Sequence, residues 1–363
     1  MDGIITGSVF VIFLLLLNAC APDDEYRQQS HRDFLKEHRF NIGQQTLLFR
    51  DTLRQRPLKT EIWYPARDTS GGNASAEYPF KLPPVSFNAR PVEGRFPLII
   101  LSHGTGGNRF SQMWLAAELA GEGFVVATVD HWGNTHDNKI PESFIKIWER
   151  PADVSYLLNR LPGESLLGRY IDTSAIGVAG FSLGGYTALA LAGAEIDYGQ
   201  LRLFSKTDEG QIEFNVPELG DISSLLNEDF IRKAGREGLH LKDNRIKAFF
   251  VMAPALGQGF TEMRQMAAVD RPVFIIGAAA DERTPVQTNA YYYHQLITGS
   301  RYAEIDAPAG HYVFMNEARA FLKRQAPRVF KDAPGVNRME IHKKVARQAL
   351  GFFNKYLKQV GER

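Results

Sequence analysis

The sequence predicts an α/β fold in which helices cover both faces of a mostly parallel, twisted sheet. From Phe96 onward, short apolar runs of strand length alternate with stretches that have helical apolar spacing. Before this point, residues 38–65 alternate apolar and polar side chains, which predicts an antiparallel N-terminal strand pair at a sheet edge. The chain has 363 residues, of which 44% are hydrophobic and 23% charged. This composition is typical of a globular domain with one large core and excludes a disordered chain.

The charges of the chain are nearly balanced, with 42 Lys and Arg against 41 Asp and Glu. A protein that binds nucleic acid usually carries an excess of positive charge. We therefore expect no nucleic-acid partner, and the sequence indicates no protein partner.

An export signal is predicted at the N-terminus, over residues 1–20. The apolar run from Val9 to Leu17 is shorter than the roughly 20 residues that span a bilayer, but it fits the core of a signal peptide. Leu17-Asn18-Ala19-Cys20 resembles a bacterial lipobox, and Cys20 is the only cysteine. We expect Cys20 to be lipidated, residues 21–37 to form a tether, and the protein to be an exported, membrane-anchored lipoprotein of the cell envelope. An ordinary cleaved signal and an uncleaved anchor remain alternatives, because no Lys or Arg precedes the apolar run and Asn18 is unusual in a lipobox.

The main domain is expected over residues 38–363. Its predicted strands after the N-terminal pair are Phe96 to Ser102, Phe124 to Val129, Ala175 to Ala179, Ile246 to Met252, Val273 to Ile276 and Tyr302 to Ile305. Its predicted helices are Gln112 to Leu119, Ala152 to Leu161, Tyr186 to Leu191 and Ile341 to Leu357, the last with a basic side that we interpret as solvated. Residues 66–95 are rich in Gly, Ser, Asn and Pro and predict a surface loop. Residues 196–244 interrupt the alternation, and either a cap over a site or a remote surface insertion explains them.

The strongest local motif is Gly180-Phe181-Ser182-Leu183-Gly184, between a predicted strand and an Ala-rich helix. In this context Gly-x-Ser-x-Gly is typical of a nucleophile elbow, a sharp turn that exposes a serine hydroxyl in a strained conformation. Glycines are needed on both sides because the turn brings backbone against backbone. We therefore predict that Ser182 is a nucleophile.

A serine nucleophile needs a base and an acid that orients the base. His311 lies in a loop after the last predicted strand, where the base is expected, although a capped surface histidine is the alternative. Asp281 follows the strand Val273 to Ile276 and is the predicted acid. Glu282 competes with it, whereas the preceding strand exits into Ala253-Pro254-Ala255 without a carboxylate. The order Ser, Asp, His is the one that the α/β-hydrolase fold requires.

Acyl transfer also needs donors for a developing oxyanion. The backbone N–H of Leu183 is one candidate. The other is the backbone N–H of Thr105, in the glycine-rich stretch after Ser102. The alternative for Thr105 is a tight turn with no catalytic role. Trp132 ends another strand at the same sheet edge, and we expect it to line a substrate pocket with His103 and Phe181. Asp130 and His131 lack further spaced ligands, so no metal site and no cofactor are predicted.

Taken together, these motifs resemble the predicted dienelactone-hydrolase and platelet-activating-factor acetylhydrolase-like group of α/β-hydrolases. The resemblance covers roughly Lys59 to Phe314. It is carried by Ile62-Trp63-Tyr64-Pro65, Leu101-Ser102-His103-Gly104-Thr105-Gly106-Gly107, Asp130-His131-Trp132-Gly133-Asn134-Thr135, Arg150-Pro151-Ala152-Asp153-Val154, Gly180-Phe181-Ser182-Leu183-Gly184-Gly185 and Gly310-His311-Tyr312. Two departures are that true dienelactone hydrolases have a cysteine at the position of Ser182, and that Phe181 replaces a histidine often found before the nucleophile.

The resemblance implies a metal-free serine esterase that acts through an acyl-enzyme on short-acyl or lipid-like esters. A serine peptidase of the same fold would need a propeller or a substantial helical cap, and only residues 196–244 offer one. A non-catalytic envelope lipoprotein that keeps the fold as a scaffold is the alternative from another class.

Overall fold

The computed structural model describes residues 38–69, 72, 74–216 and 219–358. The predicted signal segment, the lipidation residue Cys20 and the tether before residue 38 lie outside these residues. Within the described ranges, no helix combines the length and the apolar character that crossing a membrane requires.

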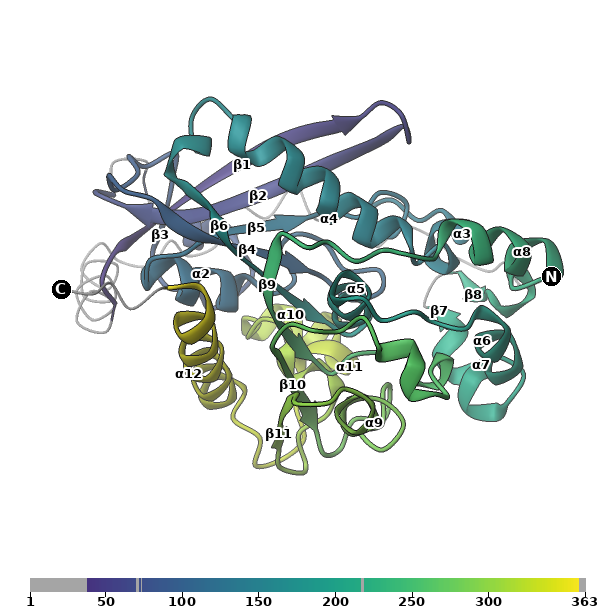
Figure 1. The fold of residues 1–363 in the computed structure, drawn as a ribbon. Coiled ribbons are helices and arrows are strands. Elements are labelled where there is room, and N and C mark those ends of the chain that lie inside the picture. The colour runs from purple at the N-terminus through teal and green to yellow at the C-terminus, as the bar shows by residue number, and fades with distance from the viewer. Residues whose placement is uncertain (1–37, 70–71, 73, 217–218, 359–363) are drawn as a thin grey trace, which may run out of the picture.

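A nine-stranded twisted sheet forms the centre of the described chain, in the order β11-β10-β9-β6-β4-β5-β2-β1-β3 (Figure 1). Neighbouring strands from β5 to β11 run parallel, whereas β2 runs antiparallel to both β5 and β1. The strands are β1 Asn41–Asp51, β2 Arg56–Ala66, β3 Val85–Phe87, β4 Phe96–Ser102, β5 Val125–Val129, β6 Ile171–Phe181, β9 Ile246–Met252, β10 Val273–Ala278 and β11 Arg301–Ile305.

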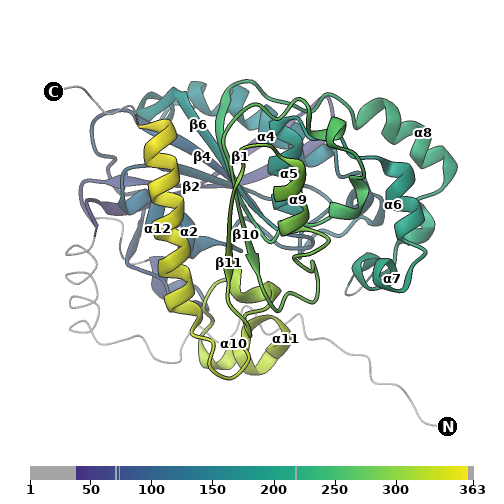
Figure 2. The same ribbon diagram turned by 60° about the horizontal axis from the view of Figure 1, so that its bottom comes forward.

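Helices cover both faces of the sheet, as predicted (Figure 2). One core lies between the sheet and α4 (Glu149–Arg160), α5 (Leu183–Ala192) and α9 (Ala290–Leu296). The other lies between the sheet and α2 (Met113–Gly121) and α12 (Arg338–Leu357). Because both faces are covered, the central strands are apolar almost without interruption; β5 and β10 are buried at every position. The shorter helices α3, α10 and α11 span Pro141–Ile145, Ala320–Gln325 and Pro327–Phe330.

The six strands predicted after Phe96 are all present, and those at Phe96 to Ser102 and Ile246 to Met252 have the predicted bounds. The prediction of a loop over residues 66–95 was wrong in one part. Val85–Phe87 forms β3, which pairs with β1 and takes the edge position that we expected for the N-terminal strand pair. A strand of three residues is too short to show periodicity in the sequence.

Residues 196–244 hold α6 (Tyr198–Phe204), α7 (Asp208–Phe214), a short hairpin of β7 (Asn215–Val216) and β8 (Gly220–Asp221), and α8 (Glu228–Glu237). The sequence predicted only weak helix at 223–233. The three helices begin at caps that the sequence supplies, because the side chains of Asp197, Thr207 and Asn227 accept hydrogen bonds from backbone N–H groups of the first turns. The Trp148 ring contacts Tyr198 and Phe230, which joins this segment to the core beside α4.

The strand register brings the carboxyl ends of the parallel strands to one edge. Ser102 pairs with Gly180, Phe181 with Met252, Met252 with Ile276, and Ala278 with Ile305. The loops that leave these ends therefore lie side by side, where open α/β sheets usually bind ligands.

Candidate active site

Ser182 lies on the sharp turn that joins β6 to α5. Its backbone has φ 55° and ψ −120°, a left-handed conformation that is strained for a residue with a side chain. A Cβ on Gly180 would lie 2.0 Å from the Gly184 carbonyl oxygen, and one on Gly184 would lie 2.0 Å from the Ser102 carbonyl oxygen. Both glycines of the motif are therefore required by close backbone approach, as the sequence predicted. Ser182 occupies the N-cap position of α5, but its hydroxyl does not cap the helix.

The structure brings Ser182, His311 and Asp281 together. The Ser182 Oγ lies 3.1 Å from Nε2 of His311, and Nδ1 of His311 lies 2.7 Å from Oδ2 of Asp281. The three residues are 5–8% exposed, so they are shielded but not sealed. The two ring nitrogens of His311 thus connect a hydroxyl to a carboxylate across 129 residues of sequence.

Asp281 is held ionised by its surroundings. Burial raises the pKa of its carboxyl, but the adjacent His311 and hydrogen bonds from Thr284 outweigh burial, so that the pKa of Asp281 is lowered from its ordinary value. Its Oδ1 accepts hydrogen bonds from the N–H groups of Arg283 (2.9 Å) and Thr284 (2.7 Å). Its neighbour Glu282 is exposed, which leaves Asp281 as the carboxylate that faces the imidazole.

Thr284 is a residue of the site that the sequence reasoning missed. Its hydroxyl lies 2.9 Å from Oδ2 of Asp281 and 3.1 Å from Nδ1 of His311, and it is buried. It therefore fixes the carboxylate that faces the ring. A Thr three residues after a loop Asp is the pattern of a local side-chain turn, and this was the signal available in the sequence.

The two candidate oxyanion donors lie beside Ser182. Leu183 begins α5, where backbone N–H groups have no helical partner. Thr105 follows Gly104, at which an added Cβ would be only 3.1 Å from Cβ of Ser182. In the described part of the chain, neither the Thr105 N–H nor the Leu183 N–H donates a hydrogen bond. The geometry leaves both groups available to an anion, and their catalytic role remains a prediction.

The three candidate pocket residues differ in position. Trp132 is 36% exposed after the end of β5. The ring centres of Phe181 and His311 lie 4.8 Å apart, so Phe181 packs against the base next to the nucleophile. The His103 ring is buried, with Nδ1 2.7 Å from the Gly104 carbonyl oxygen and Nε2 3.3 Å from the His131 N–H, so both nitrogens contact the backbone of the site loops. Contact of these residues with a substrate stays a prediction.

A second Ser, His and Asp set lies directly behind the first. The Nε2 of His131 is 2.9 Å from the Ser102 Oγ, and its Nδ1 is 3.0 Å from Oδ2 of Asp153. All three residues are 0% exposed. Burial lowers the pKa of His131 well below its ordinary value, and the cations Arg150, Arg56 and Arg54 lower it further. A neutral, sealed imidazole cannot meet a substrate, so this set is a structural network.

Arg150 connects this buried network to the loop beside Ser182. Its guanidinium is hydrogen bonded to the His103 carbonyl oxygen, to Ser102 Oγ (3.3 Å) and to Thr187 Oγ1 (3.2 Å), and it is 1% exposed. His103 precedes Gly104 and Thr105, so Arg150 anchors the backbone that carries one candidate donor. The motif from Arg150 to Val154, which belonged only to the family resemblance, thus has a physical role in the loop.

Replacing Arg150 with lysine is expected to lower kcat on an ester substrate about tenfold or more with little change in KM. Lysine keeps the charge but cannot reproduce the planar fork that reaches three acceptors. Steady-state kinetics and circular dichroism check this, with Arg160→Lys, an exposed change on the same helix, as control. Equal kcat values for the two variants would contradict the role of Arg150 in anchoring the loop that carries Thr105.

The insertion touches the loops of the site. The Arg283 guanidinium donates to the Ile212 carbonyl oxygen (3.2 Å), and Oε1 of Glu213 accepts from the Leu256 N–H (3.3 Å). Arg283 follows Asp281 closely, and Leu256 lies in the loop that leaves β9. Helix α7 is therefore fastened to two site loops, and a cap over the site stays a prediction.

The Glu213 carboxyl is expected to make stability depend on pH. Burial raises its pKa to about 7, against opposing effects of the Leu256 N–H and Arg283. The folded protein then binds a proton that the unfolded chain releases near pH 4.5, so the contribution of Glu213 to stability is fully present below that pH and is lost as pH rises through about 7. Between pH 5 and 8 we expect a loss on the order of 2 kcal/mol, which Glu213→Gln removes. Urea unfolding at both pH values measures this loss in the wild type, in Glu213→Gln and in the exposed control Glu209→Gln. The same loss in all three proteins would contradict the prediction.

The described residues include no group of three or more His, Cys, Asp or Glu side chains placed to hold a metal ion. Asp130, which we considered with His131 as a metal ligand, instead forms an ion pair with Arg109 at 2.6 Å. The chemistry that this arrangement supports is proton transfer along the line from Ser182 to His311.

Two comparisons with known proteins bear on the chain. A family model described as platelet-activating factor acetylhydrolase, isoform II, matches residues 78–138, which include the Thr105 loop and Trp132 but end before Ser182. A solved ferulic acid esterase from Streptomyces cinnamoneus superposes with a TM-score of 0.53 at 19% identity, over 88% of this chain and 91% of that one. At that identity the likeness establishes the fold. The chain is therefore an α/β-hydrolase by fold, similar to the platelet-activating-factor acetylhydrolase-like group that its motifs resemble.

Proposed function

We propose that this protein is a serine esterase that hydrolyses carboxylic esters through an acyl-enzyme. The observation that carries the proposal is the continuous line of contacts from the Ser182 hydroxyl through His311 to the Asp281 carboxylate, at 3.1 and 2.7 Å. The family match and the esterase neighbour support the same reaction class.

In the first half of the reaction, Ser182 Oγ attacks the ester carbonyl carbon while Nε2 of His311 takes its proton. The carbonyl oxygen becomes an oxyanion, which the N–H groups of Leu183 and Thr105 stabilise. His311 then gives the proton to the alcohol oxygen as the C–O bond breaks, and the acyl group stays on Ser182.

In the second half, His311 removes a proton from water, which attacks the acyl carbon and releases the acid as Ser182 regains its proton. Asp281 keeps Nδ1 of His311 protonated and stabilises the imidazolium that forms in both halves. The strained turn fixes the position of Ser182, and the N-terminus of α5 directs its positive end toward the developing negative charge.

We propose short-acyl or lipid-like esters as substrates, since Trp132 exposes an apolar ring after the end of β5, at the same edge of the sheet as Ser182. A series of p-nitrophenyl esters of increasing acyl length, together with a peptide amide, tests the proposal. We expect ester turnover with a burst of one p-nitrophenol per active site, the sign of an accumulating acyl-enzyme. Faster cleavage of the amide would favour the serine peptidase, and no turnover of either would favour the non-catalytic scaffold.

We also propose that the protein is an envelope lipoprotein anchored through Cys20, on the strength of the lipobox-like sequence alone. Metabolic labelling with a fatty-acid analogue is expected to mark the wild-type protein and to spare Cys20→Ser. Equal labelling of both proteins would remove Cys20 as the anchor, and labelling of neither would favour an ordinary signal or an uncleaved anchor.

A further inference from the structure

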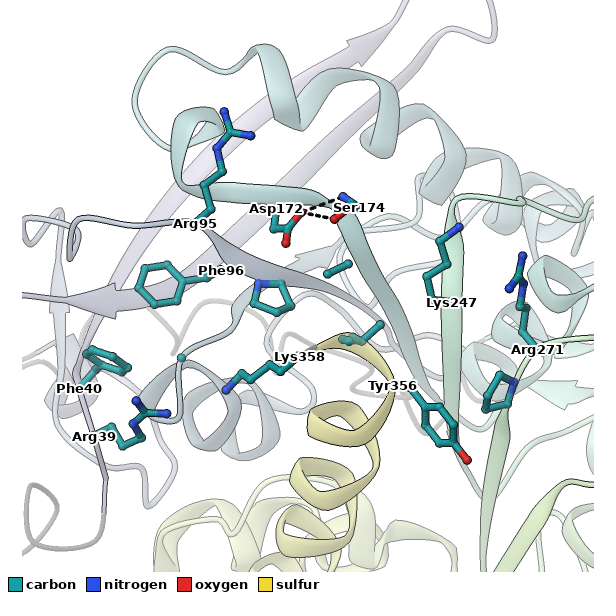
Figure 3. A pocket seen from close by; sticks show the side chains of 15 residues that line it. Arg39, Phe40, Arg95, Phe96, Asp172, Ser174, Lys247, Arg271, Tyr356 and Lys358 are labelled. Carbon is teal, nitrogen blue, oxygen red and sulfur yellow. Dashed lines mark hydrogen bonds between the residues drawn. The ribbon is translucent and has the colours of Figure 1, made fainter. Parts of the chain in front are cut away.

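A groove rich in positive charge lies at the end of the sheet opposite to Ser182. Figure 3 shows the side chains that line it. It has a volume of about 800 Å³ and is lined where β4, β6, β9 and β10 begin. Ser182 and the loops around it leave the other ends of these strands. Because β4 alone has seven residues of about 3.3 Å each, the groove and the candidate active site are about 20 Å or more apart. We call it the basic groove; its cations are Arg39, Arg95, Lys247, Arg271 and Lys358.

The charge of the basic groove is unbalanced, although that of the whole chain is not. Asp172 is the only carboxylate among the lining residues, and its Oδ1 is bound by the N–H (2.9 Å) and hydroxyl (2.6 Å) of Ser174. Within the described ranges, the exposed Arg39 and Arg95 form no ion pair, and Arg271 comes no closer than 3.8 Å to a carboxylate, that of exposed Asp270. The groove therefore presents Arg39 and Arg95 to solvent without an ion-pair partner in the described residues.

Lys358 lies partly buried in this groove. Burial lowers its pKa to about 8, repulsion from Arg39 lowers it further, and the Glu122 carboxylate opposes both effects. Its Nζ donates to the Glu122 carbonyl oxygen at 2.8 Å and lies 4.1 Å from the centre of the Phe124 ring. Negative charge in the basic groove would relieve the repulsion between these cations.

Aromatic rings accompany the cations. The Phe40 ring meets the Phe96 ring edge to face at 5.7 Å, and the Arg39 guanidinium lies 5.6 Å from the Phe40 ring. Tyr356 lines the same groove. Basic side chains with rings beside them are typical of protein surfaces that meet the headgroup region of a membrane.

The chain also enters the domain here. Residues 1–37 join the described chain at residue 38, and Arg39 and Phe40 line the basic groove. A domain held by its N-terminal side would present this edge of the sheet to the surface that holds it. The edge with Ser182 would then face away, open to substrate.

We propose that the basic groove is a docking surface for a membrane that contains anionic phospholipid. This interaction is separate from ester hydrolysis and does not depend on it. Each Lys or Arg near an anionic membrane surface adds to binding, and salt screens the attraction.

Sedimentation with vesicles tests the proposal on the full chain carrying Cys20→Ser, so that no lipid anchor forms. Binding to phosphatidylcholine vesicles with about 30% phosphatidylglycerol is compared with binding to pure phosphatidylcholine vesicles. The difference between the two subtracts binding through the N-terminal segment. We expect preference for the anionic vesicles and its loss in about 0.5 M NaCl. Charge reversal at Arg39, Arg95 and Arg271, each to Glu, is expected to lower the anionic preference about a hundredfold.

The matched control reverses three cations of the insertion, Lys206→Glu, Arg232→Glu and Arg236→Glu, and is expected to keep the preference. Circular dichroism and ester turnover establish that both triple variants are folded. Wild-type binding by the groove variant, or equal loss in the control, would overturn the proposal. Displacement from the vesicles by millimolar inorganic phosphate, beyond the effect of equal ionic strength, would also overturn it, because the groove would then be a site for a small anion.

Discussion

Replacing Ser182 with alanine is expected to lower kcat on p-nitrophenyl esters by about 10⁴-fold or more, leaving only the residual catalysis that substrate binding and the oxyanion donors supply. Alanine removes the hydroxyl oxygen that lies 3.1 Å from Nε2 of His311 and would attack the carbonyl carbon. The fold is expected to remain intact, because the Ser182 hydroxyl caps no helix and Ala tolerates the turn at a cost similar to that of Ser. Steady-state turnover and thermal unfolding measure the two effects.

The buried second set provides a control inside the same molecule. Ser102 faces the imidazole of His131 at 2.9 Å, much as Ser182 faces His311, but it is fully buried. Ser102→Ala is expected to retain kcat within about tenfold, since its hydroxyl only supports the network around Arg150. If Ser102→Ala abolished turnover while Ser182→Ala kept it, the assignment of the nucleophile would be wrong.

Replacing Asp281 with asparagine is expected to lower kcat by about 10³- to 10⁴-fold. Asparagine can offer an N–H to the ring where the carboxylate offers an oxygen, so that Nδ1 of His311 loses the partner that holds its proton. The imidazolium of the transition state also loses its counter-charge. The lowered pKa of Asp281 keeps its carboxylate ionised throughout the pH range of the assay, so the loss is expected at every pH.

Glu282→Gln is the matched change for this prediction. It alters the adjacent carboxylate, which is exposed, and is expected to leave kcat unchanged. A large loss from Glu282→Gln together with a small loss from Asp281→Asn would exchange the roles of the two residues. Equal, small losses would mean that the His311 ring is oriented by other groups, with Thr284 as the nearest one.

The sequence predicted the parallel core of the fold because both faces of the sheet are covered. Strands such as β10 then consist of apolar residues throughout, which is a strong signal. The prediction from sequence failed where the pairing of a strand depends on partners that are distant along the chain. β3 has three residues and exists because β1 offers it an open edge, which no local pattern records.

The positions of Ser182, His311 and Asp281 could be predicted because each follows the end of a strand, and strand ends meet at one edge. The contacts that support these three residues could not be predicted from the sequence. The contacts of His131 with Ser102 and Asp153, and of Arg150 with the His103 carbonyl, depend on how β4, β5 and α4 pack. Thr284 was within reach of local reasoning, since it lies three residues after Asp281.

The most direct test of the central claim is mass-spectrometric mapping of a fluorophosphonate adduct on the folded protein. Only a serine activated by a neighbouring base reacts with this reagent. We predict one adduct, on the peptide that contains Ser182, with loss of ester turnover in proportion and no labelling of Ser182→Ala. An active protein that carries no adduct, or carries it on another serine such as Ser102, would contradict the account.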